Sequence, residues 1–303
     1  MGRLLLVMLF VSCATRPPQP PPPPLPQPPP PARQNPSPMV DSTRAHERLE
    51  RRATAGRVFT IDDVLPKPVE VLVTPAAANA GHADLVIHFH GSSWLPFQAA
   101  EATGRPLVIA AINLGAGSRR YSMPFEDPAV FQRVRDRIAG DVPSIRNTWL
   151  TAFSAGYGAV RAILGQQPDA IDGVLLLDGL HASYIPDAKP VAEGGVVDTA
   201  SLEPFVRYAQ RAVAGETRFV VTHSEIFPGT FASTTETADH LLGSLDLKRT
   251  PVLQWGPLGM QQLSDVRRGS FHVLGFAGNT APDHVDHLQA YQHFLELLLI
   301  TDP

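Results

Sequence analysis

An apolar segment that runs directly into a serine between small residues is the feature that most constrains the fold. Trp149–Phe153 has the composition of a buried strand, Ser154 follows, and residues 155–160 favour a helix. A sharp strand-to-helix turn lifts a serine hydroxyl out of the sheet, and it needs small residues two before and two after the serine. Ala152 and Gly156 occupy those positions. The segment predicts a presented nucleophile, although an ordinary serine in such a turn gives the same short pattern.

The segments on either side of this turn alternate between strand-like and helix-like composition. Such alternation predicts a mostly parallel sheet covered by helices, and the first two strands are expected to pair antiparallel at one edge. The unbroken apolar runs are typical of central parallel strands. Expected strands are 58–61, 69–73, 85–91, 107–112, 148–153, 173–177, 218–222 and 270–275, and expected helices are 128–138, 155–165, 202–214, 235–245 and 282–299.

The N-terminus indicates a signal peptide. Its apolar core, Leu4–Val11, is too short to span a bilayer, and the small Ser12 precedes Cys13, the only cysteine of the chain. This arrangement resembles a bacterial lipoprotein signal, which implies a lipid on Cys13 and a membrane anchor. Ala14 implies sorting to the outer membrane of the cell envelope. Phe10 departs from the aliphatic residue usual in the lipoprotein motif, so plain secretion is the alternative.

A proline-rich stretch separates this signal from the rest of the chain. Residues 16–38 cannot form a core, and in polyproline geometry they would hold a domain roughly 60 to 70 Å from an anchor. A ligand for a proline-binding partner is the alternative. We expect a signal peptide over 1–13, a linker over 14–55 and one folded domain over 56–303. The net charge of −4 argues against nucleic acid as a partner.

The order of elements over residues 58–300, with the serine turn, resembles the α/β-hydrolase fold. Ala152 replaces the first glycine of the usual G-x-S-x-G pattern. The resemblance implies that Ser154 is the nucleophile and that two backbone N–H groups form the oxyanion hole. One is that of Ala155, and the other is that of Gly91 or Ser92, which follow an apolar strand.

The resemblance also requires an acid at a strand end. Asp178 ends a run of leucines and should emerge at the same sheet edge as Ser154. Glu225, after the next strand, is the alternative, because the family more often carries its acid there. The alternative without a catalytic role is that Asp178 caps a helix or forms a turn before Gly179. His181 is close enough in sequence to line the same pocket.

A histidine after the last strand completes the pattern in the order serine, acid, histidine. His284 and His287 both qualify, and their spacing places them on one helix face. We place His284 first because it lies nearer the loop. For each of the two histidines, the alternative is a surface residue of the helix with no catalytic role.

A metal site is the competing interpretation of the histidines. His88 and His90 with Asp178 and His181 could be ligands, but the further Asp-His expected after H-x-H in metallo-β-lactamase-like sites is missing. We therefore expect no metal and no cofactor. The aromatic residues Trp94, Phe97, Tyr157 and Tyr184 are candidate pocket walls or ordinary core.

The sequence thus favours a serine hydrolase, and the resemblance implies a carboxylic ester as substrate, either a small molecule or a lipid. A peptidase or amidase is the alternative among enzymes. The alternative outside enzymes is a catalytically silent hydrolase-like lipoprotein that binds an envelope polymer or a partner.

Overall fold

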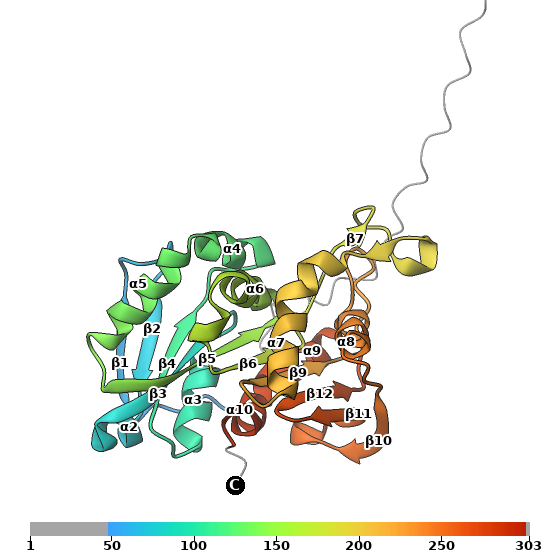
Figure 1. The fold of residues 1–303 in the computed structure, drawn as a ribbon. Coiled ribbons are helices and arrows are strands. Elements are labelled where there is room, and N and C mark those ends of the chain that lie inside the picture. The colour runs from blue at the N-terminus through green and yellow to red at the C-terminus, as the bar shows by residue number, and fades with distance from the viewer. Residues whose placement is uncertain (1–47, 301–303) are drawn as a thin grey trace, which may run out of the picture. The chain divides into compact units, whose positions relative to one another are not determined.

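A ten-stranded mixed sheet forms the centre of this computed structural model, which describes residues 48–300 (Figure 1). The sheet confirms the mostly parallel arrangement predicted from the sequence. From one edge to the other its strands are β1 (Arg57–Ile61), β2 (Val69–Val73), β4 (Leu107–Ile112), β3 (His82–Phe89), β5 (Ser144–Phe153), β6 (Gly173–Leu177), β9 (Arg218–His223), β12 (Phe271–Phe276), β11 (Gln261–Arg268) and β10 (Thr250–Trp255).

The first two strands pair antiparallel at one edge, as expected. At the opposite edge β11 and β10 add an antiparallel extension that we did not predict. This hairpin carries few apolar residues that face the core, and Leu253 and Trp255 of β10 are 76% and 75% exposed. A strand of this kind lacks the apolar run or alternation that marks a strand in a sequence. A separate short pair, β7 (Tyr184–Ile185) with β8 (Val196–Val197), lies in the connection after β6.

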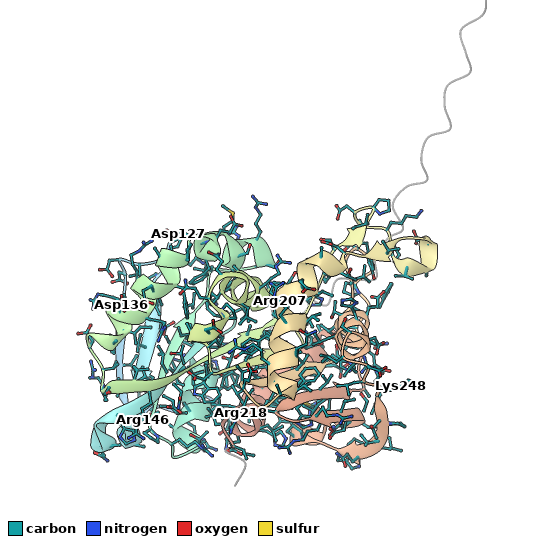
Figure 2. All side chains as sticks on the ribbon, viewed as in Figure 1. Asp127, Asp136, Arg146, Arg207, Arg218 and Lys248 are labelled. Carbon is teal, nitrogen blue, oxygen red and sulfur yellow. The ribbon has the colours of Figure 1, made fainter. Side chains whose placement is uncertain are left out.

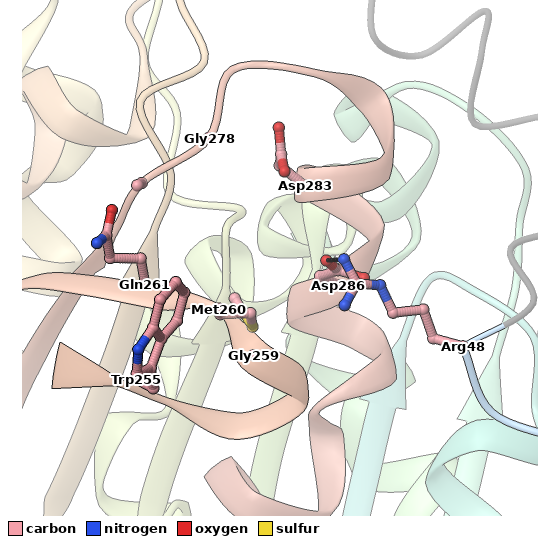
Figure 3. Close-up of a pocket in the computed structure, with 9 residues that line it drawn as sticks. Arg48, Trp255, Gly259, Met260, Gln261, Gly278, Asp283 and Asp286 are labelled. Atoms are coloured by element: carbon pink, nitrogen blue, oxygen red, sulfur yellow. Dashed lines mark ion pairs between the residues drawn. The ribbon is translucent and has the colours of Figure 1, made fainter.

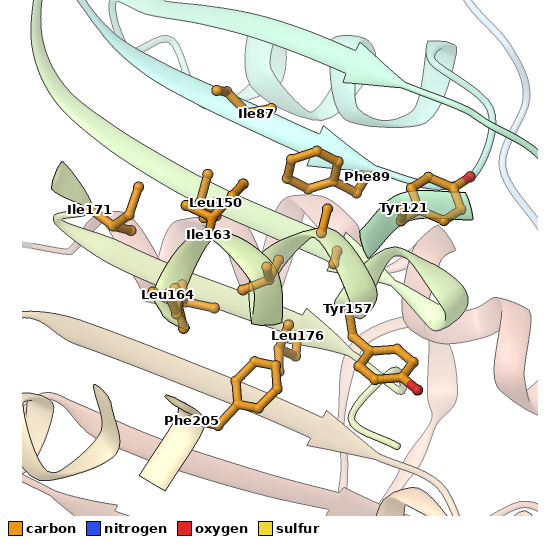
Figure 4. Close-up of a cluster of buried hydrophobic side chains, with 14 of the residues drawn as sticks. Ile87, Phe89, Tyr121, Leu150, Tyr157, Ile163, Leu164, Ile171, Leu176 and Phe205 are labelled. Carbon is orange, nitrogen blue, oxygen red and sulfur yellow. The ribbon is translucent and has the colours of Figure 1, made fainter. Parts of the chain in front are cut away.

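Side chains alternate between two cores on the two faces of the sheet, as the period of a strand requires. In β4, for example, Val108 and Ala110 belong to one core, whereas Leu107 and Ile109 belong to the other. Figure 4 shows part of the first core, where helix α6 (Tyr157–Gln166) packs on the central strands.

The helices divide between these two faces. The first core is covered by α2 (Pro75–Ala80), α4 (Ser118–Ser122), α5 (Pro128–Ala139), α6, α7 (Glu203–Val213) and α8 (Thr234–Gly243). The second core is covered by α3 (Trp94–Ala102), α9 (Ala281–Gln289) and α10 (Tyr291–Leu299). Exposed charges such as Asp136, Arg207 and Lys248 project from the surface (Figure 2).

Two helical features differ from the prediction. The expected single closing helix is interrupted at Ala290, which separates α9 from α10. Residues 94–102, for which no helix was predicted, form the helix α3, which buries Phe97 at 3% exposed, so Phe97 is core and not a pocket wall.

Residues 48–55 form no helix or strand but lie against α3 and α9. The backbone N–H groups of Arg52 and Ala55 donate to Gln98 and Glu101, and Arg48 pairs with Asp286 at 2.9 Å.

The predicted signal peptide, Cys13 and the proline-rich stretch lie outside the described residues. None of the helices within residues 48–300 combines the length and apolar character needed to cross a membrane.

We expect Leu176→Ala, in the middle of β6 and fully buried, to lower the free energy of unfolding by about 2–5 kcal/mol. Leu253→Ala is the matched control, since the same atoms are removed from an exposed strand position, and it should change stability by less than about 0.5 kcal/mol. Urea denaturation of both variants measures the difference. Equal losses would contradict the assignment of the core.

Candidate active site

The turn after β5 holds Ser154 in a strained conformation. Its φ is 46°, in the left-handed region that residues with a Cβ seldom occupy, and its side chain is almost buried at 4% exposed. The chain then passes through a 3-10 turn, η2 (Ser154–Gly156), into α6. Strain of this kind persists only where the surrounding structure holds it, and it is frequent at functional sites.

The small residues around Ser154 are required by close packing. A Cβ built on Gly156 would collide with the carbonyl oxygen of Phe89 in the neighbouring strand β3. Ala152 is fully buried opposite Phe89 in the same strand pair. The geometry therefore explains the two small positions predicted from the sequence.

Asp178 follows β6 at the same sheet edge. Phe153 and Leu177 pair across β5 and β6, so Ser154 and Asp178 each leave the sheet one residue later. Asp178 also has a positive φ, 40°, and a Cβ on the next residue, Gly179, would lie 2.7 Å from the backbone nitrogen of Ser154. The two turns are therefore in direct backbone contact.

The carboxylate of Asp178 is buried and accepts four hydrogen bonds. Ser224 donates its backbone N–H at 2.8 Å and its hydroxyl at 2.7 Å, and Thr234 donates its hydroxyl at 2.6 Å. The fourth donor is Nδ1 of His284, 2.7 Å from Oδ2. Burial alone would raise the pKa of Asp178, but the imidazoles of His287 and His284 and the hydrogen bonds hold it well below its ordinary value.

His284 lies in the first turns of α9, 5% exposed. Because its Nδ1 donates to Asp178, the neutral ring has its lone pair on Nε2. Within residues 48–300 this buried Nε2 has no hydrogen-bond partner. The ring packs on that of Phe153, with centroids 4.5 Å apart, beside the turn that carries Ser154.

The structure brings His284 to Asp178, whereas the alternative residues have other partners. His287 contacts Thr222 through Nδ1 at 2.7 Å, and burial lowers its pKa to about 4. Glu225 is exposed, and its backbone N–H donates to the carbonyl oxygen of Gly278.

The predicted oxyanion loop follows β3 at the same edge. His90 and Gly91 have φ of 74° and 108°. The N–H of His90 donates to Ile112, and the side-chain amide of Asn113 donates to the carbonyl oxygen of Gly91 at 3.1 Å. The loop is therefore held by the end of β4. Ser92, next along this loop, is exposed, and Ala155 follows Ser154 in the η2 turn.

Aromatic rings line both sides of this edge. His90 stacks on Phe153 at 5.9 Å, and His181 meets Tyr157 and Phe231 edge to face at 5.7 and 4.9 Å. Phe231 is 38% exposed and was not singled out in the sequence. It lies in a loop without regular structure, so no periodicity could identify it.

Two other candidate wall residues have structural partners. Tyr184 is buried with its hydroxyl on Glu236, which also closes the capping box of α8. Trp94 opens α3 and packs against the second core.

His88 and His90 face different partners. Nδ1 of His88 contacts Thr151 at 2.9 Å, on the side of Tyr291, whereas Nδ1 of His90 contacts Tyr121 at 2.8 Å. Burial lowers the pKa of His88 to about 3 and that of His90 to about 4. Among residues 48–300 no group of three or more His, Cys, Asp or Glu is arranged to hold a metal ion.

A cavity of about 210 Å³ lies on another side of α9, between Arg48, Trp255, Met260, Asp283 and Asp286 (Figure 3). None of Ser154, Asp178 and His284 lines it. It is therefore separate from the candidate active site.

The mostly parallel sheet with helices on both faces, and the serine turn at the carboxyl ends of its parallel strands, define the α/β-hydrolase fold. Solved structures share it. The feruloyl esterase module of Clostridium thermocellum, a mutant complexed with sinapinate, has a TM-score of 0.53 at 12% identity, over 86% of this chain and 95% of that one. The BES protein from Bacillus cereus gives 0.51 at 10% identity, over 84% and 100%.

A structure described as a ferulic acid esterase gives a TM-score of 0.50 at 11% identity, over 81% of this chain and 99% of the other. No protein-family model matches the sequence, and no curated protein matches it. At these identities the similarity concerns the fold.

The buried His88 predicts a pH dependence of stability. Its pKa is about 3 in the folded protein and about 6.5 in an unfolded chain, so the unfolded chain binds the proton first as the pH falls. Protonation of His88 in the unfolded chain should therefore lower the free energy of unfolding of the wild type as the pH falls from about 6.5 towards about 3. His88→Gln should make the decline shallower by up to about 1.4 kcal/mol per pH unit in that window.

Urea denaturation of wild type and His88→Gln at several pH values measures the two slopes. Parallel slopes would show that His88 is not held neutral by burial.

Proposed function

We propose that this protein is a serine hydrolase of carboxylic esters that uses Ser154, His284 and Asp178. The observation that carries the proposal is the state of His284. Its Nδ1 is bound to a buried carboxylate, while its buried Nε2 has no partner among residues 48–300, beside the turn of Ser154. An imidazole held in this way is prepared to accept a proton at Nε2.

In the proposed reaction Ser154 Oγ attacks the acyl carbonyl while Nε2 of His284 takes its proton. The same proton then passes to the leaving alcohol, and a water molecule repeats the sequence on the acyl-enzyme. Asp178 stabilises the imidazolium, since four hydrogen bonds keep its carboxylate ionised. The N–H groups of Ala155 and of Gly91 or Ser92 would bind the oxyanion.

The choice of an ester rests on two supports. The similar structures named above include two described as feruloyl or ferulic acid esterases. The ring of Phe231, which is 38% exposed and packs on His181, offers an apolar surface to an acyl or alcohol group. An amide substrate remains the alternative within the same mechanism.

The test is hydrolysis of short-chain nitrophenyl esters, with fluorophosphonate labelling of the serine. Ser154→Ala should abolish labelling and lower kcat by a factor on the order of 10⁴ to 10⁶. Ser244→Ala, an exposed serine at the end of α8, is the matched control and should label and hydrolyse like the wild type. Mass spectrometry should place the label on Ser154.

A folded wild type that neither labels nor hydrolyses esters would favour the second candidate, a silent hydrolase-like domain that binds an envelope polymer or partner. No specific contact in residues 48–300 favours that candidate.

We also propose that Cys13 is lipidated and anchors the protein in the cell envelope, on the sequence pattern of residues 10–13. In a bacterial host that processes lipoproteins, the full chain should incorporate labelled palmitate, and Cys13→Ser should lose all of it, since the chain has no other cysteine. Release of unlabelled wild type into the periplasm or medium would instead support plain secretion.

A further inference from the structure

A second layer of polar residues lies behind the carboxylate of Asp178. Ser224, which gives two of its four hydrogen bonds, is fully buried. Its carbonyl oxygen accepts from the ring of His223 at 3.2 Å and from the hydroxyl of Thr235 at 2.8 Å. His223 and Thr235 thus fix the backbone of Ser224, and Ser224 in turn donates two hydrogen bonds to Asp178.

Arg249 determines which nitrogen of the neutral His223 ring carries the proton. Nη1 of Arg249 contacts Nε2 of His223, and a guanidinium can only donate hydrogen bonds. Nε2 is therefore the acceptor, and the proton of the neutral ring lies on Nδ1, where it is donated to Ser224. Burial and the charge of Arg249 lower the pKa of His223 to about 4.

Arg249 is itself held in one position. Its Nε pairs with Asp239 of α8 at 2.6 Å, its Nη2 donates to the carbonyl oxygen of Thr235 at 3.1 Å, and its Nη1 also reaches Ser264 at 3.3 Å. The side chain of Arg249 is 24% exposed and that of Asp239 is 58% exposed, so water screens this ion pair and the hydrogen bonds to Thr235 and Ser264 also hold Arg249.

The sheet leaves space for this arrangement. His223, Gly275 and Ser264 are aligned across β9, β12 and β11. A Cβ on Gly275 would lie 2.5 Å from Nε2 of His223, so only a glycine at this strand position leaves room for the ring.

We propose that Arg249 and His223 are a positioning pair that fixes Ser224, and through it the carboxylate of Asp178, in the orientation that His284 needs. The inference rests on the proposed function, because it assigns the pair to the same site. The pair touches no reacting atom. Its effect passes from Arg249 to His223, Ser224, Asp178 and His284, each link a hydrogen bond of the structure.

The first test compares His223→Asn with His223→Gln. The Asn amide can replace the Nδ1 donor to Ser224, whereas the Gln amide reaches the place of Nε2 and leaves Ser224 without that donor. We expect His223→Asn to keep most of kcat and His223→Gln to lose about tenfold, with KM changed little in both. A mere packing role predicts the opposite order, because Gln fills the space better.

The second test uses pH. In Arg249→Gln the ring of His223 loses its donor and its neighbouring cation, so it can protonate at a higher pH than in the wild type. The charged and titratable groups that then face the ring are Asp178, whose charge raises the pKa of His223, and His287, which lowers it. Asp239 of α8 has lost its partner Arg249 in this variant. We expect kcat of Arg249→Gln to fall more on the acid side than that of the wild type, and the double variant Arg249→Gln, His223→Gln to lack this extra fall.

His272→Gln is the matched control. His272 lies on β12 and pairs with Asp265 at 2.8 Å, and among the described residues neither side chain of this pair forms a hydrogen bond with Arg249, His223, Ser224 or Asp178. It should lower stability without changing kcat or the pH profile. Arg249→Lys, which keeps the charge, should recover part of the loss.

A readout without substrate separates the two proposals. The His284 proton donated to Asp178 should give a far-downfield signal in the proton NMR spectrum of the wild type, which shifts or broadens in Arg249→Gln and not in His272→Gln. If the wild type is not labelled at Ser154 but its downfield signal still changes in Arg249→Gln, the hydrolase function alone is overturned. An unchanged signal and unchanged kinetics in folded Arg249→Gln would overturn the positioning pair alone.

Discussion

The buried carboxylate of Asp178 is the interaction on which the site depends. An ionised carboxylate in a protein interior is unfavourable unless hydrogen bonds replace the lost water. Here the donors come from the loop after β9, from the start of α8 and from α9, and they lie 46, 56 and 106 residues from Asp178 in the sequence. The same residue follows β6, and the next residue, Gly179, lies so close to the backbone of Ser154 that a Cβ there would be 2.7 Å from its nitrogen. One charge therefore brings together the loop after β9, the start of α8 and α9 at the end of β6, beside the turn of Ser154.

The parts of the fold that the sequence predicted are those whose patterns are local. Apolar runs such as Gly173–Leu177 are buried on both faces, so composition alone identifies them as central strands. Ser154 and Asp178 were chosen as candidates because each follows such a run, and the structure places their two turns side by side. Gly91 was chosen as a candidate for the oxyanion loop because it follows another such run.

The parts that escaped prediction depend on tertiary contacts. The segment of α3 buries residues on several sides, and no side-chain cap marks its start at Ser93, so it shows neither a helical stripe nor a helix signal. Ala290 is a good helix former, yet the chain breaks there. It is buried, and the next residue, Tyr291, is tied to Thr151 by its hydroxyl. Packing, which a local pattern does not contain, ends the helix.

The choice between neighbouring histidines has the same origin. His284 and His287 share a helix face and differ little in sequence context, but Thr222 at the end of β9 contacts one and Asp178 the other. No spacing rule specifies which strand end will meet which turn of α9. The positioning pair of Arg249 and His223 was missed for a similar reason, since its members come from a strand end and from the loop before β10.

The other histidines around the site matter because they carry no charge. Burial lowers the pKa of His90, His181, His223 and His287, so these rings are neutral where His284 would have to become a cation. A charged imidazole at any of these positions would repel the His284 imidazolium formed in the proposed reaction, and in a buried site such repulsion is strong. Neutral rings still supply hydrogen bonds and packing, as His90 does to Tyr121 and Phe153. The burial that makes an ionised Asp178 unfavourable also keeps the neighbouring rings neutral, so that the carboxylate of Asp178 is the group that would balance the charge of His284.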